Sequence, residues 1–261
     1  MRIFTFGCSY TKYYWPTWAD ILRHSLGNDV VFNYAHQGTG PSQIMYNMQI
    51  ANAKHNFNPA TDKIIIQWTQ WSREDRYING KWTADGGIPN QLFDNTWMKK
   101  FHDVDYDFIR ALTIIKTINS AYSNLIKYQY HWNLHEGINN PNMLSSPLQQ
   151  YLASVYKEGF PGINDVYTSH PTYPNIGDGH PTVYGHLEQA IKIADAIGVD
   201  ISENSKKVFI DLDAENMKLV SNHKTIKRWF KSYRHLPVSD GLNAELRDPD
   251  LENKKLWAIN D

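Results

Sequence analysis

Three short segments of the chain carry groups that could together perform nucleophilic chemistry. Gly7-Cys8-Ser9 offers a serine hydroxyl, which becomes a nucleophile when a neighbouring base removes its proton. The glycines of residues 36–40 let backbone amides approach a ligand closely, and two such amides can stabilise an oxyanion. Asp178 and His180 supply a carboxylate and an imidazole, the pair that orients and performs proton transfer for a serine.

These segments need a scaffold that brings them together, and the hydrophobic pattern predicts one. Strands alternate with helices along the first 200 residues, which favours an α/β domain with a mostly parallel sheet. The predicted strands cover residues 2–6, 30–32, 63–68 and 125–130. The predicted helices begin at Pro16 and Pro41 and cover 101–118 and 187–197, with a short one over 149–157. Sites in such sheets lie beyond the carboxyl ends of the strands, where the first two segments fall.

The three segments resemble sequence blocks of the SGNH (GDSL-type) hydrolase family, in particular of its phage-encoded members, over residues 1 to about 198. The matching stretches are Gly7-Cys8-Ser9-Tyr10, Asn33-x-Ala35-x-x-Gly38 and Asp178-Gly179-His180-Pro181. The resemblance implies a flavodoxin-like three-layer α/β/α fold. It also implies hydrolysis of acyl esters. We expect the reaction to pass through an acyl-enzyme and to use no cofactor and no metal.

The resemblance also distributes roles among the residues. Ser9 takes the role of nucleophile, His180 that of general base and Asp178 that of its orienting partner. The amides of Ser9 and Gly38 take oxyanion-hole roles. The common family spacing puts the aspartate three residues before the histidine, where this chain has Gly177, whereas Asp178 lies two before it.

The third block departs from the family pattern Gly-x-Asn-Asp, because Trp68-Thr69-Gln70-Trp71 stands in its place. Gln70 can donate the same amide hydrogen bond as asparagine, from one methylene further out. We therefore expect Gln70 to complete the oxyanion hole, with Thr69 and Gln67 as competing candidates.

Two other interpretations of the same residues stay open. Cys8 stands where the family has aspartate and could itself be the nucleophile, although adjacent residues of an extended segment point to opposite sides. Asp178, His180 and His186 could ligate a metal, but their spacing is not diagnostic of one. His186 at a helix start is more simply a structural residue.

Four residues are candidates for contact with substrate. Trp68 and Trp71 flank the third block and could bind a sugar or an acyl chain, or pack in the core. His36 lies in the second-block loop. Arg73 could bind an anionic group of the substrate or pair with Glu74 or Asp75.

Composition limits the partners. The 261 residues include 26 Lys+Arg and 27 Asp+Glu, a net charge of −1, whereas a nucleic-acid-binding domain would need a basic excess. One cysteine excludes an internal disulfide and a cysteine-built zinc site. No apolar run reaches the ~18–20 residues of a membrane span. The first residues lack a signal-peptide pattern, so we expect a cytoplasmic protein.

The character of the sequence changes after residue 200. We expect residues 1–200 to form the hydrolase-like domain and 201–261 a C-terminal appendage packed on it, with a short strand over 208–212. The stretch 224–234 is basic and aromatic, which suits a docked helix with a solvated face, or a membrane- or nucleic-acid-binding one. We favour the docked helix.

The expected function is thus serine-dependent hydrolysis of an acyl ester, and the aromatic content suggests an O-acetylated carbohydrate. The expected partner is a small-molecule or carbohydrate ester, with no nucleic acid and no membrane; a homo-oligomer stays open. The alternatives are a non-catalytic binding or structural protein that keeps the fold, and an acyltransferase that uses the same triad.

Overall fold

The computed structural model describes residues 1–13, 15–82, 93–131, 145, 147–148, 150, 152, 165–166, 170–174 and 179–221. At its centre is a sheet of five strands in the order β2-β1-β3-β6-β7, and every neighbouring pair is parallel. The strands are β1 (Arg2–Phe6), β2 (Val31–Asn33), β3 (Asp62–Trp68), β6 (Ile126–His131) and β7 (Asp165–Val166). This order is the flavodoxin-like one.

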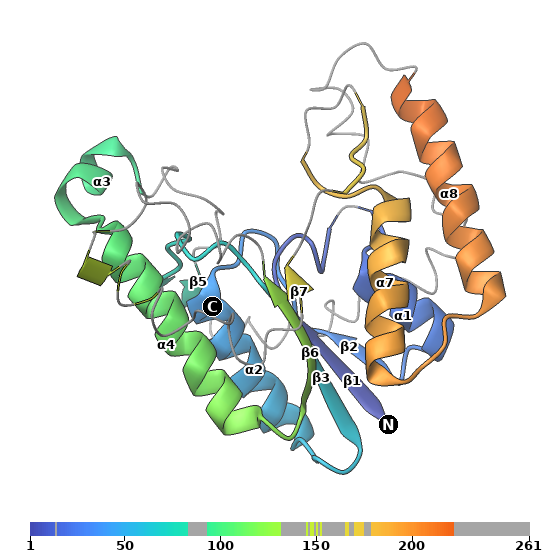
Figure 1. Cartoon of the computed structure of the whole chain (residues 1–261), viewed down its shortest axis with the longest axis horizontal. Coiled ribbons are helices and arrows are strands. Elements are labelled where there is room, and N and C mark those ends of the chain that lie inside the picture. Colours follow the sequence, from blue (N-terminus) through green and yellow to red (C-terminus); the bar gives the residue numbers. More distant parts are fainter. Residues whose placement is uncertain are drawn as a thin grey trace.

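Helices cover both faces of this sheet (Figure 1). One face carries α1 (Trp18–Leu26) and α7 (Val183–Ile197), with α8 (Glu203–Ser221) outside them. The other face carries α2 (Pro41–His55) and α4 (Val104–Tyr122). The short helix α3 (Asn95–Phe101) comes directly before α4 in the sequence. A small hairpin of β4 (Tyr77–Ile78) and β5 (Lys81–Trp82) lies apart from the main sheet. The expected three-layer α/β/α architecture is therefore confirmed.

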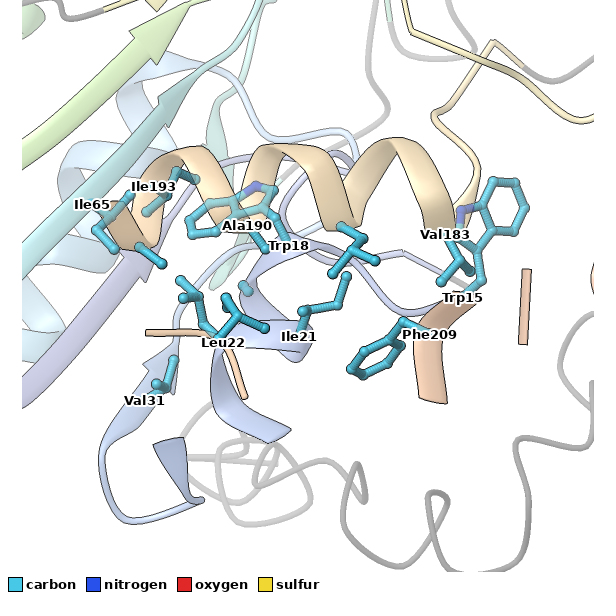
Figure 2. Packing of buried hydrophobic residues seen from close by; sticks show 14 of the residues in the cluster. Trp15, Trp18, Ile21, Leu22, Val31, Ile65, Val183, Ala190, Ile193 and Phe209 are labelled. Atoms are coloured by element: carbon cyan, nitrogen blue, oxygen red, sulfur yellow. The ribbon is translucent and has the colours of Figure 1, made fainter. Parts of the chain in front are cut away.

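Alternation along the central strands divides the core between these two layers. Ile65 of β3 packs with α1 and α7, whereas Ile64 and Ile66 pack with α2 and α4. Figure 2 shows the first of these clusters, in which side chains of α1 and α7 meet beside the sheet. A strand covered on both faces has a continuous apolar run, which is why residues 63–68 were identifiable from sequence.

Local signals also fix the helix ends. Thr17 is the N-cap of α1 and forms a capping box with Asp20, and Gly27 ends the helix with φ of 104°. Pro41 occupies the first turn of α2, where its missing N–H costs nothing. The predicted helix starts at Pro16 and Pro41 therefore lie within two residues of the observed ones.

The C-terminal region differs from its prediction. Residues 208–212 belong to α8 and do not form a strand. Ser205, Phe209, Leu212 and Asn216 are buried at helical spacing, while Ile210 between them is exposed. Four of the five residues 208–212 are apolar, so the sequence of this short run did not show the helical spacing. Neither α3 nor the short strand β7 was anticipated.

Helix α8 packs on α1 and α7, and its Phe209, Leu212 and Val220 belong to the same core cluster. The division of the chain at residue 200 stays a prediction. The basic stretch 224–234 lies outside the described residues, as does most of the predicted helix over 149–157. Of the helices that are described, none is long and apolar enough to cross a membrane.

Candidate active site

Ser9 lies in the turn that follows β1, and its hydroxyl meets the imidazole of His180. Ser9 Oγ is 2.7 Å from Nε2 of His180, within hydrogen-bond range. The amides of Thr11 and Lys12 donate to the carbonyl oxygen of Cys8, which closes the turn. Ser9 is only 6% exposed, whereas His180 is half-buried, so the base side of the pair remains in reach of the cavity. An imidazole at this distance can accept the hydroxyl proton as the serine attacks.

The turn requires glycine at position 7. A Cβ there would lie 2.2 Å from Oγ1 of Thr11 and 2.9 Å from Oε1 of Gln67, both closer than atoms can pack. At Gly7 the backbone lies against Gln67 of β3 on one side and Thr11 of the turn on the other. The close approach places the nucleophile directly at the carboxyl end of β1.

The residues that follow Ser9 also hold the base. The ring of Tyr13 stacks on His180 with centroids 3.8 Å apart and 17° between the planes. The hydroxyl of Tyr10 donates to the carbonyl of Gly179 at 3.0 Å, and the indole of Trp15 donates to the carbonyl of Pro181 at 2.8 Å. Sequence reasoning missed these positioning residues, although the aromatic run after the serine was the available signal.

A second set of contacts anchors the segment around His180 to α7 and α8. The side chain of Thr182 caps α7 by accepting from the amide of Gly185, and Tyr173 accepts from the amide of Val183 at 3.2 Å. The hydroxyl of Tyr173 donates to Asp213 at 2.7 Å. Burial, and then Asp213, raise the pKa of Tyr173 above its usual value, which keeps the phenol protonated and donating.

The second-block loop lies against the first turn. The amide of His36 donates to the carbonyl of Gly7 at 3.3 Å, and the side chain of Asn33 donates to the carbonyl of Thr11 at 2.8 Å. Gly38 has φ of 75°, a conformation that favours glycine. Within the described part of the chain, the amides of Ser9 and Gly38 donate no hydrogen bond. No described group therefore occupies either amide.

In and beside the third block, one side chain makes hydrogen bonds within the fold and two others line the cavity. Gln67 is committed to structure: its Oε1 accepts from the amide of Cys8 at 3.1 Å, and its Nε2 donates to the carbonyl of Trp68 at 2.7 Å. Thr69 and Gln70 both line the cavity beside His180. The hydroxyl of Thr69 is buried and meets no hydrogen-bond partner among the described residues. Thr69 and Gln70 are thus the two side chains of the third block that could donate to an oxyanion.

The thiol of Cys8 also borders this cavity, but it has a partner. Its Sγ lies 3.1 Å from Oε1 of Gln67 and 4.0 Å from Oγ of Ser9. A thiol that donates to an amide oxygen carries its proton, whereas the nucleophilic form is the thiolate. The surroundings of Cys8 therefore favour the serine over the cysteine as nucleophile.

The cavity itself has a volume of about 160 Å³. The described residues that line it are Cys8, Tyr10, Gln67, Thr69, Gln70, Arg73, Gly179 and His180. It opens where the turn after β1, the loop after β3 and the segment before α7 converge. This is the expected edge of a parallel sheet.

Three predicted substrate contacts do not lie there. Trp68 is 1% exposed, belongs to the core and donates its indole N–H to Gln129 at 2.9 Å. Trp71 is 4% exposed and packs edge-on against Phe108 of α4. His36 is exposed, and its ring contacts the carbonyl of Gln37. The two tryptophans are therefore core residues: Trp68 is the buried last residue of β3, and Trp71 in the loop after it turns back into the same cluster.

The loop after β3 is fastened on both sides. Asp75 accepts from the amide of Gln43 at the N-terminus of α2, and Arg110 of α4 pairs with Glu74 and donates to the carbonyl of Arg73 at 2.8 Å. Burial raises the pKa of Asp75 to about 6. These contacts hold Thr69, Gln70 and Arg73 in a fixed position at the cavity.

The remaining site predictions concern Asp178 and a metal. Asp178 lies outside the described residues, so its orienting role stays a prediction. In the described ranges, no group of three or more His, Cys, Asp or Glu side chains could hold a metal ion. His186 is fully buried, and burial, followed by His170 and His180, lowers its pKa well below the usual value. A neutral, buried imidazole agrees with a structural role for His186.

The sequence matches no protein-family model and no curated protein. Among solved structures, one similar chain is a "putative acylhydrolase" from Bacteroides fragilis. The similarity covers 76% of this chain and 86% of that one, with a TM-score of 0.38 and 15% sequence identity.

Proposed function

We propose that this protein is a serine-dependent hydrolase of acyl esters, of the SGNH type. The observation that carries the proposal is the 2.7 Å separation between Ser9 Oγ and His180 Nε2. Nucleophile and base come from residues 171 positions apart, yet they meet at the carboxyl end of the sheet beside a cavity. The side chains of Thr69 and Gln70 line that cavity, and the amides of Ser9 and Gly38 donate no hydrogen bond within the described part of the chain.

The reaction follows from these groups. His180 accepts the hydroxyl proton while Ser9 Oγ forms a bond to the ester carbonyl carbon, which gives a tetrahedral oxyanion. When this intermediate collapses, the C–O bond to the alcohol breaks and His180 returns the proton to the leaving oxygen. A water molecule then attacks the acyl-enzyme by the same route and releases the acid and free Ser9.

Hydrogen-bond donors would stabilise the negative charge that develops on the carbonyl oxygen. The amides of Ser9 and Gly38 and the side chain of Gln70 or Thr69 form the proposed oxyanion hole, which supplies more stabilisation to the transition state than to the substrate. Asp178 is the proposed partner that orients His180 and stabilises its protonated form. The ring of Tyr13, stacked on His180, holds the plane of the imidazole independently of Asp178.

The size of the cavity favours a small acyl group. A volume of about 160 Å³ is close to that of an engineered protein cavity that binds benzene. An acetyl group fits such a space, and an O-acetylated carbohydrate is the proposed natural substrate class.

Labelling with a fluorophosphonate tests this function. The probe should phosphonylate Ser9, identified by mass mapping, and the label should be lost in Ser9→Ala and reduced at least ~10³-fold in rate in His180→Gln. Cys8→Ser is the matched control beside the nucleophile and should still be labelled at Ser9. Label on another residue, or none on a folded protein, would rule the proposal out.

A further inference from the structure

The cavity beside Ser9 carries a positive charge that the described residues around it do not neutralise. Of the described residues that line it, Arg73 alone has a permanently charged side chain, and none is a carboxylate. The remaining side chains there are the neutral or polar groups of Cys8, Tyr10, Gln67, Thr69 and Gln70, with His180 as the base.

The guanidinium of Arg73 makes one hydrogen bond within the described part of the protein. Its Nη1 donates to the carbonyl of Thr39 at 3.0 Å, and its Nε is buried with no hydrogen-bond partner among the described residues. No ion pair joins Arg73 to a carboxylate in the ranges that the structure describes.

The acidic neighbours in sequence are occupied elsewhere. Glu74 pairs with Arg76 at 2.6 Å and with Arg110. Asp75 faces the start of α2, where the charged groups that affect its pKa are Arg110 and Glu74. The alternative in which Arg73 simply pairs with Glu74 or Asp75 is therefore not the arrangement that is found.

A guanidinium that lines a small cavity, and whose one hydrogen bond among the described residues is to a carbonyl, is suited to an anionic ligand. Its planar fork of donors matches the geometry of a carboxylate or phosphate, and partial burial strengthens such a pair. Removing a cation from water without a counter-ion is unfavourable, so a bound anion would stabilise this arrangement.

We infer that the ester substrate carries an anionic group, such as a carboxylate, a few bonds from its scissile carbonyl, and that Arg73 binds it. This inference rests on the proposed hydrolase function. Arg73 acts as a specificity residue, because it lines the same cavity as Gln70 and His180 and takes no part in the proton transfers. The short reach of the cavity keeps the charge and the ester close together.

Matched pairs of esters that differ by one charge test the inference and show which side of the ester carries the anion. p-Nitrophenyl hemisuccinate against p-nitrophenyl acetate places a carboxylate on the acyl side. para-Acetoxybenzoate against its methyl ester places it on the alcohol side. For wild type, kcat/KM should favour the charged member of at least one pair by about 10- to 100-fold, the range of one hydrogen-bonded charge pair.

Substitution of Arg73 should remove this preference. In Arg73→Gln the charged-to-neutral ratio of kcat/KM should fall to near one, mainly through KM, and Arg73→Lys should restore part of it. A general loss of loop structure would lower both members of a pair alike and leave the ratio unchanged. Arg76→Gln is the matched control, because Arg76 pairs with Glu74 at 50% side-chain exposure and does not line the cavity.

The outcomes separate the inference from the function on which it rests. A wild-type enzyme that is labelled at Ser9 by the uncharged fluorophosphonate, yet prefers neither charged ester, would overturn the role of Arg73 alone. An Arg73→Gln variant that keeps the wild-type preference for a charged ester would overturn that role as well. Failure of labelling at Ser9 would instead overturn the hydrolase proposal.

Discussion

The hydroxyl of Tyr173 donates to Asp213 of α8 at 2.7 Å and accepts from the first residue of α7, which joins the C-terminal helix to the segment that carries His180. Asn216, one turn further along α8, donates to the same hydroxyl at 3.1 Å. Asp213 also accepts from the amide of Tyr184. Helix α8, which contributes no residue to the cavity lining, thereby supports the position of the base.

Removal of that hydroxyl should destabilise the protein. Tyr173→Phe leaves the buried amide of Asn216 without its acceptor, at a cost of about 1–3 kcal/mol. Chemical denaturation measures the change. The control is Tyr184→Phe at a residue 43% exposed, which should change the free energy of unfolding by less than about 0.5 kcal/mol. If the two substitutions changed the free energy of unfolding equally, the hydroxyl of Tyr173 would have no structural role.

Helix α8 should contribute to stability through its buried face. Phe209→Ala removes a fully buried ring from the cluster of α1 and α7 and should cost about 3–5 kcal/mol. Ile210→Ala on the same helix, at a residue 46% exposed, should have a small effect. Thermal unfolding compares the two variants. If Phe209→Ala unfolded at the same temperature as wild type, α8 would not be an integral part of the fold.

The third block should reveal its oxyanion donor through kcat. Gln70→Ala or Thr69→Val, whichever removes the true donor, should lower kcat by ~10²–10³ with little change in KM. Thr69→Val keeps the buried volume nearly constant, so stability serves as the check on folding. Unchanged kcat in both variants would leave only the two backbone amides in the proposed oxyanion hole.

Asp75 should make stability depend on pH with a defined sign. Its pKa is raised from 3.8 to about 6 by burial, so the folded protein holds this proton more tightly than the unfolded chain does. Its contribution to stability is therefore largest below about pH 4 and declines as pH rises to about 6, by up to about 3 kcal/mol.

The variant Asp75→Asn isolates this effect, since its side-chain oxygen can still accept from the amide of Gln43. Urea denaturation at about pH 4 and about pH 7 should show wild type losing stability relative to the variant as pH rises. A difference between the two proteins that does not change with pH would contradict the raised pKa.

Much of the scaffold was accessible from the sequence alone, because local patterns encode it. These patterns span only a few residues each. They are the continuous apolar run of β3, the capping residues around α1 and the proline that begins α2. The parallel α/β class followed from their alternation. Besides the unanticipated α3 and β7, the sequence misled at residues 208–212, where a short apolar run is compatible with a strand or a helix and only packing on α1 and α7 separates the two.

The site depended on the tertiary structure to a greater degree. The residue types of Ser9 and His180 indicated their chemistry, but only the fold brings their side chains to 2.7 Å. Sequence could not tell that Gln67 is occupied by Cys8 while Thr69 and Gln70 face the cavity, nor that Trp68 and Trp71 are buried. It also left open whether Arg73 pairs with Glu74. Which neighbour a side chain meets depends on elements far apart in the chain, so the direction of each of these groups is a property of packing and not of local sequence.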